Sequence, residues 1–356
     1  MEPLYDRVLA FIEDPAADRF EDLALAVFAH QFACCPAYRD FAGRRGATPA
    51  TVADWTAIPA VPIVAFKHAE LCCGPAQRTF LSSGTTAGPE VRSRHLVPDL
   101  RLYHRSALAG LRRFLFPDPA RMRIASLIPS ADAQPQSSLS QMATWALEGW
   151  GSDDSATVAS PEGIDVERFV ALLDASQTDG QPLAILATTG ALIRALDALQ
   201  ARGRTFRLPH GSRLMDTGGD KGAPRHLSRN GLLHAVWNAF AIPGYFAVNE
   251  YGMAELSSQY YDSSIADRAA GRHAPRRKLG PHWARWRILD PVTLEPAAAG
   301  AVGLLCHVDL ANAGSAMAVL SEDLAVAVAD GFELRGRAAG AEARGCSLSA
   351  AEWSAA

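Results

Sequence analysis

The sequence has few lysines and no long apolar segment. Among its 34 basic residues, only Lys67, Lys221 and Lys278 are lysines, so a reaction that depends on lysine has few candidates. No uninterrupted apolar run approaches the ~18 residues that a membrane-spanning helix needs. The first residues also lack the basic and then apolar pattern of a secretory signal. We therefore expect a cytoplasmic protein without a membrane span.

The sequence also lacks an excess of positive charge. Its 34 basic and 38 acidic residues leave a formal net charge of −4. Nucleic acid and anionic bilayers are therefore disfavoured as partners, because both attract strongly cationic surfaces. Of the 356 residues, 49% are hydrophobic, which is enough for a large core. At ~150 residues per domain, this length predicts two domains or one large α/β domain.

The six cysteines lack the spacing of common cysteine sites. Cys34, Cys35, Cys72 and Cys73 form two adjacent pairs, not the Cys-x-x-Cys steps that surround zinc. Adjacent pairs in so long a chain do not indicate a disulfide framework either. We therefore expect reduced thiols, with these four residues in the core or on helices.

Hydrophobic periodicity divides the chain into three parts. The first 45 residues and residues 100–115 are expected to be helical. Strands are then expected at 123–128, 182–187 and 245–248, and helices at 137–150, 166–173, 191–199 and 224–241. Closely spaced strands follow at 285–289, 303–308, 316–320 and 324–328. This pattern predicts an α/β core over 1–280, a β-rich subdomain over 281–335 and a short tail over 336–356.

A run of small residues is the sharpest local signal. It reads Ser82-Ser83-Gly84-Thr85-Thr86-Ala87-Gly88-Pro89. Small side chains let backbone N–H groups approach an anion, and the hydroxyls add donors for phosphate oxygens or support for a metal. The run lacks the Gly-x-x-x-x-Gly-Lys pattern of a P-loop. A flexible surface loop would have the same composition, so that alternative stays open.

Two further stretches follow predicted strands. Gly218 and Gly219 would let a flat ligand approach the backbone closely. Within 249–255, the ring of Tyr251 offers a stacking face and Glu255 offers a hard oxygen ligand for Mg²⁺. Taken singly, each stretch is also explained as an ordinary strand end with a turn.

A fourth stretch, Ser321–Leu324, pairs a carboxylate with a later arginine. The carboxylate of Asp323 can accept hydrogen bonds from two ribose hydroxyls, and Arg337 can neutralise phosphate. A hairpin with ordinary turn residues is the alternative.

We also consider three basic residues near the hydroxyl-rich run. Lys67 could pair with a carboxylate or end a helix, and we favour the structural role. His68 and His95 could donate to phosphate, but histidines near loops are more often polar surface residues.

Together, the order and spacing of the four stretches resemble the adenylate-forming superfamily, which includes acyl- and aryl-CoA ligases, luciferases and peptide-synthetase adenylation domains. A closer resemblance is to the acyl-protein synthetases, also called long-chain-fatty-acid luciferin-component ligases. Pro59–Lys67, Tyr251–Tyr260 and Gly336–Ser349 carry it. It implies an α/β adenylate-forming core with mixed sheets and helical cover, a smaller β-rich subdomain, and a mobile C-terminal domain that is largely absent.

The resemblance implies ATP- and Mg²⁺-dependent activation of a carboxylic acid, expected to be fatty, as an acyl-adenylate. The acyl group would pass to an enzyme cysteine and then to a partner such as an acyl reductase or a carrier protein. The implied catalytic residues are Cys346, Glu255, Arg92 and Arg337. The residues implied to bind the nucleotide are Ser82, Ser83, Gly84, Thr85, Thr86, Gly88, Thr217, Gly218, Gly219, Tyr251, Gly252 and Asp323. The implied metal ligands are Glu255, Thr85 and Thr86.

Departures from the family pattern leave alternatives open. The phosphate loop usually ends with a lysine, which Arg92 would replace, and Ala254 stands where threonine is usual. No lysine follows Lys278, so the catalytic lysine of the superfamily's C-terminal domain has no counterpart. Arg344 would favour the thiolate of Cys346. A ligase that acylates CoA or a carrier protein, or a non-catalytic adenylate-binding scaffold, would share these motifs.

Overall fold

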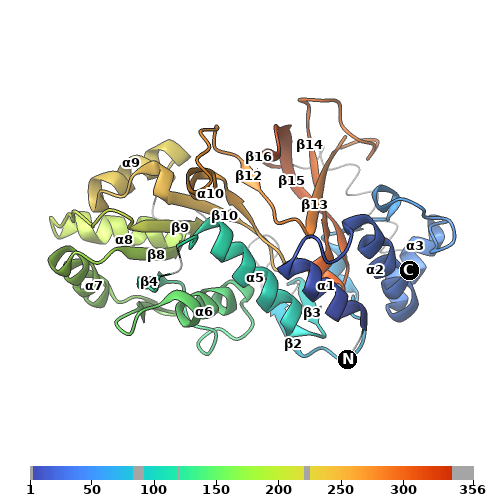
Figure 1. Ribbon diagram of the computed structural model, residues 1–356, viewed down its shortest axis with the longest axis horizontal. Helices are drawn as coiled ribbons and strands as arrows, with labels where there is room; N and C mark the ends of the chain where they lie inside the picture. The colour runs from blue at the N-terminus through green and yellow to red at the C-terminus, as the bar shows by residue number, and fades with distance from the viewer. Residues whose placement is uncertain (1–2, 83–91, 119, 220–224, 339–356) are drawn as a thin grey trace. The chain divides into compact units, whose positions relative to one another are not determined.

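The structure, a computed structural model, describes residues 3–82, 92–118, 120–219 and 225–338 (Figure 1). Contacts between residues divide the chain into two units. Unit 1 comprises Met1–Ala109, Met253–Gln259 and Arg277–Ala356, and unit 2 comprises Gly110–Gly252 and Tyr260–Arg276. Each unit is therefore assembled from segments that are distant in the sequence. The boundaries expected near residues 280 and 335 remain predictions.

Unit 2 is built on a mostly parallel sheet. Its strand order is β11-β10-β9-β8-β4-β5, and β11 runs antiparallel to β10. The strands are β4 Arg123–Leu127, β5 Ala156–Thr157, β8 Leu183–Thr188, β9 Arg213–Thr217, β10 Ala247–Tyr251 and β11 Tyr260–Asp262. Every residue of β4 is buried, as expected for a parallel sheet whose two faces are both covered. The carboxyl ends of neighbouring parallel strands lie at one edge of this sheet.

Helices connect the strands of unit 2. They are α6 Ser138–Trp150, α7 Val166–Asp179, α8 Thr189–Ala201, α9 Arg229–Phe240 and α10 Ser264–Ala269, with a short η2 Gly244–Phe246 and a hairpin of β6 Ala159–Ser160 and β7 Gly163–Ile164. The side chains that cap α6 to α9 are Ser137, Asp165, Thr188 and Ser228. Each accepts a backbone N–H that would otherwise lack a partner in the first helical turn. The helix predicted over 224–241 begins only at Arg229, because Ser228 caps it.

Unit 1 contains an antiparallel sheet. Its order is β13-β14-β15-β16-β12, and β1 joins β15 in parallel. The strands are β1 Val61–Pro62, β12 Lys278–Leu279, β13 Ala284–Leu289, β14 Val302–Asp309, β15 Ala318–Val328 and β16 Gly331–Arg337. A separate antiparallel pair, β2 Arg78–Leu81 and β3 Arg94–Val97, lies on either side of the hydroxyl-rich run in the sequence.

Helices of the N-terminal segment pack against this sheet (Figure 1). They are α1 Pro3–Glu13, α2 Phe20–Cys34, α3 Pro36–Arg44 and α4 Ala65–His68, followed in the chain by α5 Leu100–Phe114, with short η1 Trp55–Ala57 and η3 Leu310–Asn312. One apolar cluster joins Val8, Val27 and Phe28 of the helices to Val308 and Val319 of the sheet. Each such buried side chain contributes roughly 1.5–3 kcal/mol. Among the described residues, no helix combines the length and apolar character needed to span a bilayer.

The C-terminal strands differ from the prediction in one respect. Residues 316–320 and 324–328 were expected as separate strands, but both contribute to the single strand β15. The intervening Ser321–Asp323 contains no glycine or proline that would end a strand. The irregularity is a register shift between Leu324 and Ala325 instead. As a result, Asp323 lies opposite Arg337 in the β15–β16 pair.

The expectation of reduced cysteines throughout is wrong. Cys34, at the end of α2, forms a disulfide with Cys73, and their Cα atoms lie 5.0 Å apart. The two positions are 39 residues apart in the chain, so adjacency in the sequence does not reveal their proximity. Cys35 is free and buried, as predicted. Cys306 is also free and buried, whereas Cys72 is free and only half-buried.

Candidate functional site

Among the described residues, Glu255 is the most deeply buried of the predicted site residues in unit 1. Only 3% of its surface is exposed, and this burial raises the pKa of its carboxyl above the usual range. A hydrogen bond with Ser93 and the positive charges of Arg337 and Lys67 act in the opposite direction and favour the carboxylate. The site therefore holds an acidic oxygen donor in a dry environment, with a hydroxyl and two cations acting on it.

Asn312 fixes the backbone of this acidic residue. Its side-chain Nδ2 donates to the carbonyl of Glu255 over 2.9 Å and to the carbonyl of Ala316 over 2.7 Å. Its Oδ1 lies 2.7 Å from Nε2 of His95 and accepts from the Ser257 hydroxyl over 3.2 Å. All the hydrogen-bonding atoms of the amide are therefore used, and they connect the Glu255 segment to β3 and to the loop after β14.

Asp309 holds the other end of the same segment. Its carboxylate accepts hydrogen bonds from the Ser258 hydroxyl over 2.6 Å, the Ser257 amide over 2.9 Å and the Ala311 amide over 3.0 Å. Complete burial raises its pKa to about 6, although these hydrogen bonds favour the charged form. A buried carboxylate with three donors rigidifies the backbone that it bridges.

Ser82 and Ser93 close the base of the hydroxyl-rich segment. The Ser82 amide donates to the Ser93 carbonyl over 3.1 Å, and the Ser93 amide donates to the Ser82 hydroxyl over 3.0 Å. Arg92 donates from Nε to the Ser82 carbonyl and from Nη2 to the Leu81 carbonyl over 3.5 Å. Its guanidinium is therefore hydrogen-bonded to the backbone at the end of β2, where the hydroxyl-rich run begins. The remaining predicted phosphate-loop residues, Ser83, Gly84, Thr85, Thr86 and Gly88, lie outside the described residues, as does Cys346.

Asp323 and Arg337, which the sequence singled out separately, lie opposite each other in the β15–β16 pair. Nε of Arg337 lies 3.5 Å from Oδ1 of Asp323, and Nη2 lies 3.3 Å from Oε2 of Glu322. The arginine side chain is 46% exposed, so it can also meet a ligand. Its charge acts on Glu255 as well, which places Glu255, Asp323 and Arg337 in one electrostatic neighbourhood of unit 1.

Unit 2 places its predicted site residues at adjacent strand ends. Thr217 is the last residue of β9, and it lies in register with Glu250 of the parallel strand β10, which ends at Tyr251. Gly218 adopts a φ of 71°, which a residue with a Cβ rarely adopts. The Thr189 hydroxyl lies 3.0 Å from the carbonyl of Gly218 and holds this turn in place. Gly219 follows Gly218, and Gly252 follows Tyr251, at the same edge of the sheet.

A buried charge network supports this edge, and sequence reasoning did not anticipate it. Nη1 of Arg229 lies 2.6 Å from Oδ1 of Asp216, and its Nη2 lies 3.3 Å from Oδ2 of Asp262. Asn249 donates to Asp216 from its side chain and to Asp262 from its backbone, each over 2.9 Å. Arg276 lies 2.5 Å from Asp262. Paired charges therefore join β9 to β11, and Asn249 of β10 is hydrogen-bonded to both carboxylates.

Of the basic residues near the hydroxyl-rich run, His95 lies in surroundings different from those expected. His95 was expected on the polar surface, but it is 2% exposed and hydrogen-bonded to Asn312. Burial lowers its pKa to about 4, so the ring is neutral at pH 7. Lys67 lies in the last turn of α4, which fits the structural role that the sequence favoured, and its positive charge also acts on Glu255. No local motif marked Ser93 or Asn312, because their contacts join segments that are distant in the chain.

A comparison with protein families identifies the chain. The family described as acyl-protein synthetase, LuxE, matches residues 4–353. The chain belongs to the acyl-protein synthetase family. Its class is that of the ATP-dependent, AMP-forming ligases, as the motifs predicted. A comparison with curated protein sequences gives no match.

Several solved structures share the fold of this acyl-protein synthetase, although their sequences are only distantly similar to it. An open conformation of 2-hydroxyisobutyryl-CoA ligase in complex with 2-HIB-AMP and CoA is 13% identical, with a TM-score of 0.61 over 89% of this chain and 74% of that chain. The same ligase in a postadenylation state is 14% identical, with a TM-score of 0.60 over 86% and 63%. An ATP-bound RpMatB-BxBclM chimera is 14% identical, with a TM-score of 0.51 over 85% and 57%.

These similarities confirm the predicted fold class, a mixed α/β adenylate-forming core. This chain spans only 57% to 74% of the length of these three structures.

Proposed function

We propose that the protein converts a carboxylic acid, expected to be a fatty acid, and ATP into an acyl-adenylate and pyrophosphate in the cytoplasm. It then transfers the acyl group to its own Cys346. Family membership supports the first step, as do the acyl-AMP and ATP named for the structurally similar ligases. The structural observation that carries the proposal is the buried carboxylate of Glu255, on which the charges of Lys67 and Arg337 act.

The first step joins two anions. A carboxylate oxygen attacks the α-phosphorus of ATP, and pyrophosphate leaves, so the site must align both reactants and screen their charge. Arg337 and Arg92 supply guanidinium groups for this purpose, and Lys67 supplies an ammonium group.

The donor set at Glu255 fits a magnesium ion. Mg²⁺ prefers hard carboxylate oxygens and retains several of its waters, and a buried carboxylate with a raised pKa gains from a nearby cation. We propose Glu255 as its protein ligand, with Thr85 and Thr86 assisting. When bound, the ion would neutralise phosphate charge.

The nucleotide-binding roles that we propose follow the family motifs. Tyr251 would stack on adenine, and the Gly218-Gly219 turn would admit the flat ring. Asp323 would accept the ribose hydroxyls. Thr217 and Gly252 would contribute at the strand ends, and the segment from Ser82 to Gly88 would bind the phosphates.

The second step is thioester formation. The Cys346 thiolate attacks the acyl carbonyl, a carbon–sulfur bond forms, and the bond from the carbonyl carbon to the phosphate oxygen breaks to release AMP. The thioester would then be presented to an acyl reductase or a carrier protein.

Mass spectrometry of the intact protein tests the acceptor. Wild-type protein incubated with ATP, Mg²⁺ and labelled fatty acid, without CoA, should gain one acyl group. Cys346→Ser should gain none, whereas Cys72→Ser, which removes another accessible thiol, should behave as wild type. Pyrophosphate exchange without any protein adduct would overturn the acyl-cysteine step.

CoA is the rival acceptor, because the similar ligase is described in complex with 2-HIB-AMP and CoA. Release of acyl-CoA, with no adduct on the protein, would establish this second candidate function. If the protein binds ATP but catalyses no exchange with any acid, it is a scaffold and not a ligase.

A further inference from the structure

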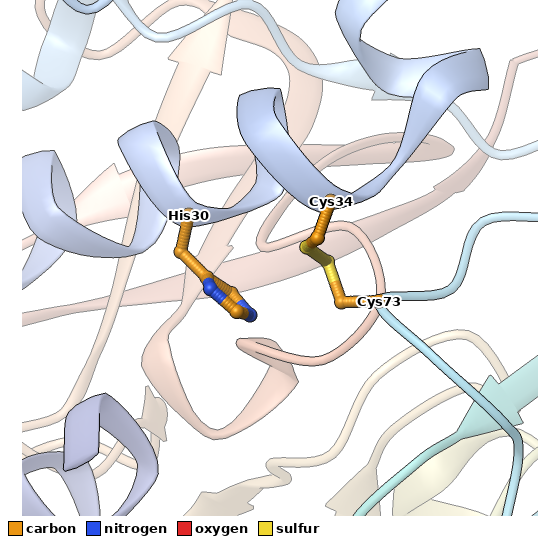
Figure 2. A group of neighbouring side chains, drawn as sticks. All are labelled: His30, Cys34 and Cys73. Atoms are coloured by element: carbon orange, nitrogen blue, oxygen red, sulfur yellow. A yellow bond between two sulfur atoms is a disulfide. The ribbon is translucent and has the colours of Figure 1, made fainter. Parts of the chain in front are cut away.

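Three side chains with metal-binding atoms, to which the proposed ligase reaction assigns no role, gather in unit 1. His30 and Cys34 lie four residues apart on α2, and Cys73 approaches them from the segment after α4 (Figure 2). Residues four apart on a helix share a face. One ligand atom from each of the three residues lies within 4.8 Å of the others. Imidazole and two sulfurs are the donors that zinc prefers.

The backbone around this cluster is held without the help of the disulfide. Gln31 of α2 donates to the carbonyls of Asn312 and Ala313, each over 3.0 Å. On the other side, the Cys73 amide donates to the Gly314 carbonyl over 2.9 Å. Both cysteine-bearing segments are therefore anchored on the same loop after β14. Opening the sulfur–sulfur bond would leave the two side chains facing each other.

The imidazole of His30 also has a partner that orients it. The Tyr5 hydroxyl lies 3.3 Å from Nε2 of His30, and the two rings meet edge to face with centroids 5.5 Å apart. Histidines that bind metals commonly hold one ring nitrogen in a hydrogen bond while the other binds the metal. His30, Cys34 and Cys73 are each half-buried, so ions and small reductants can reach them.

We propose that reduction of the Cys34–Cys73 disulfide creates a zinc site formed by Cys34, Cys73 and His30. A cellular dithiol supplies two electrons and two protons, the sulfur–sulfur bond breaks, and the reductant becomes a disulfide. Zn²⁺ then displaces both thiol protons and forms two zinc–sulfur bonds and one zinc–nitrogen bond. Water takes the fourth position of the tetrahedron.

The disulfide and the zinc-bound state exclude each other, because the sulfurs of Cys34 and Cys73 either bond to one another or bind the metal. Zinc–sulfur bonds of about 2.3 Å in a tetrahedron hold the two sulfurs about 3.8 Å apart. Rotation of the cysteine side chains supplies that separation while the backbone stays anchored. The site therefore binds zinc only in the reduced protein.

The test is zinc binding by the full-length protein in a Cys346→Ser background, which removes the tail thiol. Protein reduced with a phosphine should bind one Zn²⁺ per chain in competition with a chromophoric chelator. Oxidised protein should bind none. Cys34→Ser should abolish binding. His30→Ala, which removes a ligand, should weaken binding by more than the 10–100-fold typical for loss of a group that only orients a ligand.

Two controls separate the site from general thiol effects. Cys35→Ser changes the next residue in the chain, whose sulfur faces the Glu70 carbonyl at 3.8 Å, and Cys306→Ser changes a thiol in the sheet; both should bind zinc as wild type. Cobalt added to the reduced protein should give thiolate-to-metal absorption that Cys34→Ser loses even if its stability changes. No zinc bound to reduced protein, or equal binding by Cys34→Ser and Cys35→Ser, would overturn the proposal.

Discussion

The side-chain amide of Asn312 donates a hydrogen bond to the backbone carbonyl of Glu255 over 2.9 Å. Through the same side chain, His95 and Ser257 are connected to this segment. The buried acidic group proposed to hold Mg²⁺ is thus positioned by a residue 57 places further along the chain. The geometry of the site depends on this connection.

Replacing Asn312 with alanine should reduce acid-dependent pyrophosphate exchange at least tenfold at temperatures where the variant is fully folded. Removing the amide leaves buried groups unpaired, each at a cost of roughly 1–3 kcal/mol, and it frees the Glu255 backbone. Leu304→Ala provides the control, because it removes a fully buried side chain from a different cluster of unit 1. That change should cost roughly 2–5 kcal/mol of stability but leave exchange near wild type. Equal losses of exchange in the two variants would contradict a positioning role.

Arg337→Met should lower exchange about tenfold. Its guanidinium lies beside Asp323 and acts on Glu255, and loss of one preorganised charge commonly costs 10²–10³ in rate at fully buried sites, with less expected at a half-exposed one. The matched variant is Arg335→Met on the same strand, where the side chain is 50% exposed and pairs with Glu333. It should keep wild-type exchange. Identical rates for the two variants would remove Arg337 from the site.

The stability of the protein should fall on acidification in part because of His95. Burial lowers its pKa from 6.5 to about 4, so the unfolded chain takes up a proton at a pH where the folded chain does not. The contribution of the neutral ring is complete above pH 6.5 and is lost as the pH falls towards 4. Linkage gives a loss of about 2 kcal/mol between pH 7 and pH 5.

Urea unfolding at several pH values measures this loss. His95→Gln should show a shallower decline from pH 7 to pH 5 than wild type, whatever its absolute stability. His210→Gln, at an exposed position in unit 2, should keep the wild-type decline. A slope for His95→Gln equal to that of wild type would show that another group governs it.

Tyr251→Ala should weaken equilibrium ATP binding about tenfold, because stacking on a base contributes ~1–3 kcal/mol. Tyr251→Phe should bind as wild type, since it keeps the ring. Tyr245→Ala removes a 40% exposed ring elsewhere in unit 2 and should not change ATP affinity. If Tyr251→Ala binds ATP normally, the proposed adenine contact is absent.

Local sequence patterns predicted much of the fold. A buried apolar run predicted β8, and a periodic segment predicted α6. Two glycines after a predicted strand indicated the turn at Gly218. These features depend on neighbouring residues in the chain.

The sequence could not reveal contacts between segments that meet only after folding. Asn312, in η3 after β14, contacts the backbone of Glu255. Arg229 of α9 pairs with Asp216 of β9 and Asp262 of β11. Cys34 and Cys73 likewise appear as parts of unrelated adjacent pairs until α2 packs beside the later segment. Long-range contacts of this kind leave no spacing pattern in a single sequence.

Acid-dependent exchange of labelled pyrophosphate into ATP tests most directly whether the protein activates a carboxylate. With Mg²⁺ and fatty acids of increasing chain length, wild-type protein should catalyse exchange that requires the acid, and Glu255→Gln should lose it at least 100-fold while remaining folded. If wild-type protein binds ATP but exchanges no pyrophosphate with any acid, the proposed carboxylate activation is contradicted.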